Sequence, residues 1–217
     1  IDFDFICSRL IEQAIQKMRS MLEIEGLQNK KPVNILIFST QQTEGKSRIQ
    51  SAIAGKLAEF GFSVLSANYK LDNYRPKHSF TYSNTNAPIY YNLNTYSFNK
   101  NSVQDILGHE INTTNFDFVL VEIPSITHQA YPPGLIKDID FGIVVTRSNR
   151  SWTKSDENSL NGIMQFMKFN PTIFLNGVQA ETLEVLLGEL PRKRSFFRRI
   201  IKKMVTLQFF QRNSLNK

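Results

Sequence analysis

Five short apolar runs recur along the sequence, and segments with helical periodicity lie between most of them. The run VNILIF at 33–38 is rich in β-branched residues and is typical of a buried strand. Strands that are apolar along their whole length are buried on both faces, as in a parallel sheet covered by helices. The sequence therefore predicts an α/β fold, a parallel β-sheet with helices on both faces. The expected strands are 33–38, 63–67, 117–123, 140–146 and 171–178.

Apolar residues at helical spacing predict the helices between these strands. An amphipathic helix is expected over 5–25, ending near Gly26, and a second over 46–60, ending at Gly61. Residues 68–116 are rich in Asn, Tyr, Ser and Thr, and we expect them to be irregular apart from one helix. The remaining helices are expected at 102–109, 154–168, 180–188 and 195–210.

The 217 residues are enough for one domain with a substantial core. We expect that domain to span 1–191, with an N-terminal helix and linker over 1–30, and a basic amphipathic tail to follow over 192–217. No apolar run approaches the ~20 residues that a membrane span needs. The acidic N-terminus does not resemble a signal peptide, and a start at Ile1 suggests a piece of a longer chain. The single cysteine, Cys7, fits a reducing compartment.

A phosphate-binding loop is expected where the first strand meets its helix. The segment FSTQQTEGKS at 38–47 ends like the motif G-x-x-x-x-G-K-[ST], but Thr40 stands where the first glycine is usual. The lysine of such a loop reaches phosphates, the hydroxyl binds Mg²⁺, and backbone N–H groups at a helix N-terminus hold phosphate oxygens. The alternative is a bare Gly-Lys-Ser in a surface turn, which the strand before and the helix after argue against.

This motif gives the first set of expected site residues. Lys46 is expected to be catalytic and to bind phosphate, and Ser47 is expected to bind phosphate and Mg²⁺. The other expected cofactor-binding residues, mainly through their backbone, are Gln42, Thr43, Glu44 and Gly45.

Several segments resemble the cytoplasmic P-loop domain of the bacterial tyrosine kinases, a family of deviant-Walker P-loop NTPases. The family's loop commonly reads S-x-x-P-G-E-G-K-[ST], so a residue other than glycine at position 40 is usual there. FDFVLVEIPSI resembles the second Walker motif, and FLNGV resembles the segment near the adenine. QAIQKMRSML is similar to the helix that helps close the family's ring oligomer. The matching segments are 34–65, 116–126, 141–158, 174–178 and 13–22.

The resemblance implies ATP or ADP and Mg²⁺ as cofactors. Glu122 stands at the second Walker aspartate and is implied as a catalytic and metal-binding residue, and Asn176 is implied near the base. The family regulates the chain length and export of capsule and exopolysaccharide. The resemblance therefore implies a cytoplasmic location at the inner face of the bacterial inner membrane. The implied partners are a polysaccharide chain-length or export membrane protein, or the chain's own transmembrane domain, and further copies in a homo-oligomer.

The departures from the family's pattern fall on catalytic carboxylates. Asn68 and Lys70 stand where the family has a D-x-D motif, and neither side chain supplies the missing negative charge. Gln41 stands where the partitioning ATPases have a signature lysine, which argues against that subgroup. All seven tyrosines lie before residue 132, whereas the kinases carry theirs in a C-terminal tail.

We therefore expect a degenerate nucleotide-binding regulator, a pseudokinase. Two alternatives stay open. One is an active ATPase or tyrosine autokinase with non-standard metal ligands, and the other is a nucleotide-free interaction scaffold.

The basic tail suggests a surface for an anionic partner. Residues 192–217 carry nine Lys or Arg and no acid, so the net charge of +7 leaves −2 for residues 1–191. A basic amphipathic helix over 192–210 fits an anionic membrane surface. The alternatives are a terminal helix packed on the domain and an acidic partner protein. Because the basic charge is confined to the tail, we expect no nucleic-acid partner.

Overall fold

The computed structural model of the chain describes residues 3–69, 87–93, 100–109 and 111–179. The chain divides into a compact unit of Ser8–Val178 and a second unit of Ile1–Cys7 with Gln179–Lys217. Lys70, the helices expected at 180–188 and 195–210, and the tail 192–217 lie outside the described residues. Among the helices that are described, none has the length and apolar character that a membrane crossing needs.

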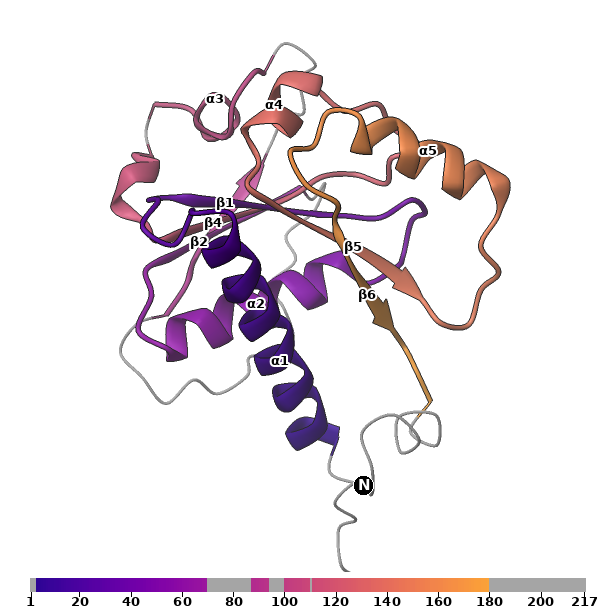
Figure 1. Cartoon of the computed structure of the whole chain (residues 1–217), viewed down its shortest axis with the longest axis horizontal. Helices are drawn as coiled ribbons and strands as arrows, with labels where there is room; N and C mark the ends of the chain where they lie inside the picture. Colours follow the sequence, from indigo (N-terminus) through magenta and orange to yellow (C-terminus); the bar gives the residue numbers. More distant parts are fainter. Residues whose placement is uncertain (1–2, 70–86, 94–99, 110, 180–217) are drawn as a thin grey trace, which may run out of the picture. The chain divides into compact units, whose positions relative to one another are not determined.

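Six parallel strands form one sheet, in the order β3-β2-β4-β1-β5-β6 (Figure 1). Every residue of β1 and β4 is buried, as expected for the continuous apolar runs that encode them. The prediction of a parallel sheet is confirmed. The strands are β1 (Val33–Phe38), β2 (Val64–Tyr69), β3 (Ile89–Leu93), β4 (Phe118–Glu122), β5 (Phe141–Arg147) and β6 (Thr172–Asn176).

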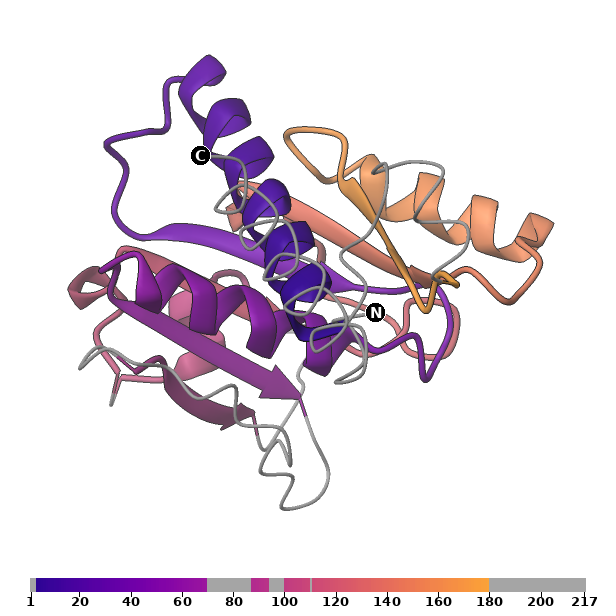
Figure 2. The same ribbon diagram turned by 90° about the horizontal axis from the view of Figure 1, so that it is seen from below.

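Helices cover both faces of this sheet, as the sequence predicts. Alternate residues of β1 separate the two cores: Ile35 and Ile37 pack with α1 and α2, whereas Leu36 and Phe38 pack with α3, α4 and α5. Figure 1 shows these two sets on opposite sides of the strands, and Figure 2 views the sheet from the side of α1 (indigo) and α2 (purple). The helices are α1 (Phe3–Ile24), α2 (Lys46–Glu59), α3 (Val103–Leu107), α4 (Pro133–Asp138) and α5 (Lys154–Met164), with a 3₁₀ turn, η1, at Thr113–Asn115.

Helix α2 ends at Gly61 as predicted, and the mechanism is visible in the backbone. Gly61 has φ 89°, a left-handed conformation that only glycine adopts without strain. Its N–H donates to the Ala58 carbonyl at 3.0 Å, and the Phe62 N–H donates to the Leu57 carbonyl at 3.2 Å. This pair of bonds is the Schellman arrangement, which satisfies carbonyls at the helix end.

Strand β3, helix α4, the 3₁₀ turn η1 and several boundaries differ from the prediction. Strand β3 lies in the segment expected to be irregular, because an edge strand with exposed residues such as Ile89 and Tyr90 needs no continuous apolar run. Helix α4 has only six residues, too few to show a period of 3.6. Strand β2 continues to Tyr69, so Asn68 lies inside the strand and not after it. Helix α5 ends at Met164, four residues before the expected end.

Candidate functional site

The loop between β1 and α2 lies at the carboxyl ends of the strands. Strand β1 has β4 on one side and β5 on the other. Helix α2 leads the chain to β2, beyond β4, whereas the later strands β5 and β6 lie on the opposite side of β1. Ligands of open α/β sheets bind at such a switch in strand order, outside the carboxyl ends. The fold therefore places the loop 39–45 where a ligand crevice is expected.

The loop backbone has the features of an anion-binding turn. Thr43 and Gly45 adopt left-handed conformations, with φ 58° and 94°. Within the described part of the chain, none of the backbone N–H groups of residues 42–46 donates to a protein acceptor. Such groups in front of a helix N-terminus form a concave site for phosphate oxygens.

Gly45 is required at its position for two reasons. Its positive φ disfavours any other residue, and a Cβ atom there would lie 2.3 Å from the Asn176 side-chain nitrogen. That nitrogen donates to the Glu44 carbonyl at 2.9 Å, so the end of β6 contacts the loop. The structure thus brings Asn176 to the loop backbone. Its expected proximity to a nucleotide base stays a prediction.

Lys46 begins α2 and turns back toward the start of the loop. Its Nζ donates to Ser39 Oγ at 3.0 Å, and Ser39 Oγ donates to the Gln41 carbonyl at 2.5 Å. Burial lowers the pKa of Lys46, while the carboxylates of Glu122 and Glu44 oppose that shift. A partly desolvated ammonium gains more from an added anion than one in water does. Lys46 is therefore placed to favour phosphate over a neutral ligand.

Ser47 and Glu122 meet across the site from two different elements. Ser47 Oγ donates to Glu122 Oε1 at 3.0 Å, and Glu122, the last residue of β4, is buried. Hydroxyl and carboxylate oxygens are the donors that Mg²⁺ prefers, and Mg²⁺ commonly binds one or two carboxylates together with phosphate oxygens. Among the described residues, no three His, Cys, Asp or Glu side chains cluster to form a metal site. The donor set fits a magnesium ion that arrives with a phosphate ligand.

Glu44 shows a contact that the sequence prediction did not anticipate. Its buried carboxylate accepts hydrogen bonds from the Arg150 Nε and the Arg147 backbone N–H. Any role of Glu44 toward a phosphate therefore falls to its backbone, and its side chain is committed to an ion pair.

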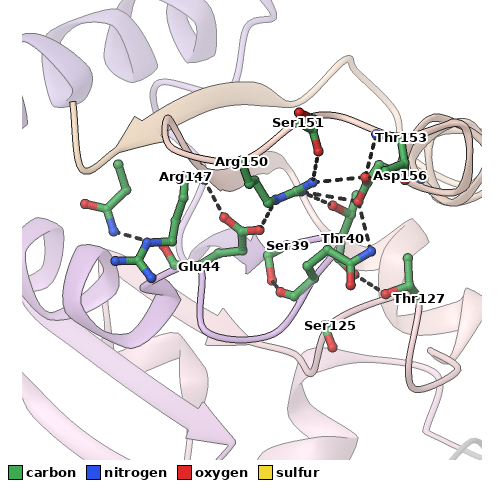
Figure 3. A network of polar contacts seen from close by, with 12 residues as sticks. Ser39, Thr40, Glu44, Ser125, Thr127, Arg147, Arg150, Ser151, Thr153 and Asp156 are labelled. Atoms are coloured by element: carbon green, nitrogen blue, oxygen red, sulfur yellow. Dashed lines mark hydrogen bonds and ion pairs between the residues drawn. The ribbon is translucent and has the colours of Figure 1, made fainter. Parts of the chain in front are cut away.

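Arg150 extends this ion pair into a larger network, drawn in Figure 3. Its guanidinium donates to Thr40 Oγ1 at 2.9 Å and to both carboxylate oxygens of Asp156 at 3.0 and 3.2 Å. We call Arg150 with Thr40, Glu44 and Asp156 the Arg150 network. It joins both ends of the loop to the turn between β5 and α5.

Asp156 is the buried centre of that network. Its side chain is fully buried and accepts hydrogen bonds from Thr153, the N-cap residue of α5, through the backbone N–H at 2.8 Å and Oγ1 at 2.6 Å. Gln41 donates to it at 3.1 Å. Burial alone would raise the pKa of Asp156, but the bonds from Thr153 and Arg150 hold it well below its usual range. Thr153 and Asp156 form a capping box, a pattern that is visible in the sequence. The contact of this box with the loop 39–45 is not visible in the sequence.

The loop after β4 also contacts the loop 39–45. The Ile126 N–H donates to the Ser39 carbonyl at 3.0 Å, and the Thr127 N–H donates to the Thr40 carbonyl at 3.2 Å. The start of the loop 39–45 is therefore held from the β4 side and from the β5 side.

Replacing Thr43 by glycine is expected to stabilise the protein. A left-handed conformation costs an ordinary residue about 1–2 kcal/mol, and glycine loses about 0.5–1 kcal/mol in chain entropy, so a net gain of about 1 kcal/mol is expected. The melting temperature should rise by about 2–4 °C in a chain of this size. Calorimetry measures it, with Gln42→Gly as the control, because Gln42 has no positive φ and glycine there should destabilise. A lower melting temperature for Thr43→Gly would show that the threonine conformation is not strained.

The structure is similar to the kinase domain of the Escherichia coli tyrosine kinase ETK. The TM-score is 0.57 with 15% sequence identity, over 76% of this chain and 74% of that chain. At this identity the likeness concerns the fold, and it agrees with a P-loop NTPase-like α/β architecture. No protein-family model and no curated protein matches the sequence.

Proposed function

We propose that this chain binds ATP or ADP with Mg²⁺ in the loop 39–45. The observation that carries the proposal is the meeting of Lys46, Ser47 and Glu122 at the carboxyl ends of β1 and β4, beside loop N–H groups without described acceptors. The similarity in fold to a tyrosine kinase domain supports it.

Each residue has a separate task in this proposal. The backbone of residues 42–46 donates hydrogen bonds to phosphate oxygens, and Lys46 exchanges its contact with Ser39 for a phosphate. Ser47 and Glu122 would hold Mg²⁺, which supplies positive charge to the phosphates when it is bound. Asn176 holds the Glu44 carbonyl and so supports the loop end that faces the nucleotide.

We further propose that catalysis is weak or lost and that the role is regulatory, as a pseudokinase. The end of β2 supports this: Asn68 carries no charge, and its side-chain oxygen already accepts a hydrogen bond from Ser66 Oγ at 3.3 Å. An amide cannot replace the carboxylate that a metal-dependent phosphoryl transfer needs there.

The cellular role rests on the family resemblance of the sequence. It is the regulation of exopolysaccharide or capsule synthesis and export at the inner face of the bacterial inner membrane. The proposed partners are a polysaccharide chain-length or export membrane protein, an anionic membrane surface for 192–210, and further copies of the chain. The proposed division into a domain, 1–191, and a tail, 192–217, belongs to the same proposal.

Calorimetric titration of the whole chain with Mg·ADP and Mg·ATP tests nucleotide binding. Dissociation constants in the micromolar range, with weaker binding after Mg²⁺ is removed by chelation, are the expected result. No heat at millimolar nucleotide would exclude the proposal and leave the nucleotide-free scaffold. Steady hydrolysis of ATP, or phosphate transfer to tyrosine, would instead support the active enzyme and contradict the pseudokinase.

Replacing Ser47 by alanine is expected to weaken Mg·ADP binding about tenfold and to leave Mg²⁺-free ADP binding unchanged. The hydroxyl is a metal ligand in the proposal, so its loss removes only the contribution of magnesium, roughly one charge-assisted contact. Titrations with and without Mg²⁺ measure both constants, and Ser51→Ala, four residues along α2, is the control. Equal loss under both conditions would mean that Ser47 does not act through the metal.

A further inference from the structure

The Arg150 network ties the loop 39–45 to a helix that lies outside the loop itself. Arg150 contacts Thr40 at the start of the loop and Glu44 near its end. On its other side it holds Asp156, in the first turn of α5. The guanidinium presents donors in a fixed planar fork, which can fix two partners in relative position.

The loop needs such support because its own sequence does not define its shape. Thr43 holds a left-handed conformation that disfavours threonine. A strained backbone persists only where surrounding contacts over-determine it. The nearest contacts of this kind are those of Glu44, the residue that follows Thr43, with Arg150 and the Arg147 N–H.

We propose that Arg150 is a positioning residue for phosphate binding. Through its contacts with Glu44 and Thr40, it holds the loop 39–45 in the shape that binds phosphate. The proposal rests on the proposed nucleotide site. Arg150 does not contact the phosphates, because its guanidinium is committed to the two carboxylates and to Thr40.

Trp152 gives this proposal a spectroscopic signal. It is the chain's single tryptophan, and the Arg150 guanidinium lies over its ring at 5.3 Å from the centroid. Trp152 is 42% exposed, so its emission depends on how Arg150 covers its ring. Loss of the Glu44 contact removes the acceptor of the Arg150 Nε, so it should change how the cation lies on Trp152.

The test compares Arg150→Gln and Glu44→Gln with Lys154→Gln in the whole chain. Lys154 has the same charge four residues away, is exposed and pairs only with Glu157 in the described contacts, so it is a matched control. Loss of Arg150 or Glu44 should weaken Mg·ADP binding by about 10- to 100-fold, the loss typical when residues that orient the ligands of a metal site are replaced. Lys154→Gln should bind as the wild type does. Arg150→Lys should recover only part of the affinity, because it keeps the charge without the fork.

Two further readouts separate positioning from general destabilisation. The double variant Arg150→Gln/Glu44→Gln should bind no more weakly than the poorer single variant, because both remove one interaction. In the ligand-free protein, Glu44→Gln should change Trp152 emission, whereas Mg·ADP should change the emission of the wild type little, because its loop already has the shape that binds phosphate. A folded Arg150→Gln variant that binds Mg·ADP within twofold of the wild type, or losses that add in the double variant, would overturn the proposal. If the wild type itself binds no ADP, the proposed function fails together with this proposal. If the wild type binds ADP and Arg150→Gln binds it equally well, only this proposal fails.

Discussion

Replacing Asp156 by alanine is expected to lower the free energy of unfolding by about 3 kcal/mol, because breaking a buried ion pair typically costs about 3–5 kcal/mol. The side chain is fully buried and accepts hydrogen bonds from Arg150, Gln41 and Thr153. Its removal also takes away half of the capping box of α5, since only the bonds from Thr153 to the carboxylate are lost. The estimate lies at the low end because Arg150 keeps its contact with Glu44. In thermal unfolding the melting temperature should fall by about 6–12 °C.

Glu157→Ala is the matched control for this prediction. Glu157 follows Asp156 in the first turn of α5, but its side chain is half exposed and pairs with Lys154 at the surface. An exposed pair of this kind contributes about 0–1 kcal/mol. Asp156→Asn should fall between the two variants, since an amide keeps one acceptor. Equal melting temperatures for Asp156→Ala and Glu157→Ala would rule out a stabilising role for the buried carboxylate.

The pH dependence of stability follows from the same residue. Folding lowers the pKa of Asp156, so its ionised form stabilises the folded state. That contribution is complete above the unfolded-state pKa, about 3.9, and is lost as the pH falls from there toward the lower folded-state pKa. The stability difference between the wild type and Asp156→Asn should therefore be constant near neutral pH and shrink below about pH 4. Urea unfolding at several pH values measures this difference.

The fold was predictable where hydrophobic pattern determines structure. Strands buried on both faces, such as β1 and β4, must be apolar throughout, so their sequences identify them. The same logic fails at the edge of the sheet, where β3 pairs on one side only among the described strands and contains exposed residues such as Tyr90. Helix α4, six residues long, escapes detection because periodicity needs several turns.

The candidate site was predictable only as far as local motifs reach. The motif gives Lys46 and Ser47, and strand β4 ends at Glu122, so parallel pairing of β1 with β4 brings them together. The Arg150 network joins residues more than 100 positions apart. No spacing in the sequence reports that contact, although the capping box of Thr153 and Asp156 marks one end of it. Long-range ion pairs between loops, such as that of Glu44 with Arg150, could therefore be found only from the structure.

Replacing Lys46 by alanine is expected to weaken Mg·ATP and Mg·ADP binding about 100-fold or more. Each hydrogen bond to a charged group contributes roughly 1.5–3 kcal/mol, and a factor of ten corresponds to about 1.4 kcal/mol. Lys46 is partly desolvated, and burial already lowers its pKa, so a phosphate should gain more from it than from an exposed lysine. Titration calorimetry of both proteins measures the two dissociation constants.

Lys154→Ala controls for the loss of one positive charge, because its side chain is 75% exposed and lies on α5 and not on the loop. It should bind nucleotide as the wild type does. The ligand-free stability of Lys46→Ala should change little, since the cost of burying the ammonium offsets its attraction to Glu122 and Glu44, and Ser39 keeps its own bond to the Gln41 carbonyl. A loss of affinity without a loss of stability would identify Lys46 as a ligand-binding group. Unchanged affinity in Lys46→Ala, with nucleotide still bound, would place the nucleotide elsewhere on the chain, because a phosphate in the loop 39–45 cannot avoid this side chain.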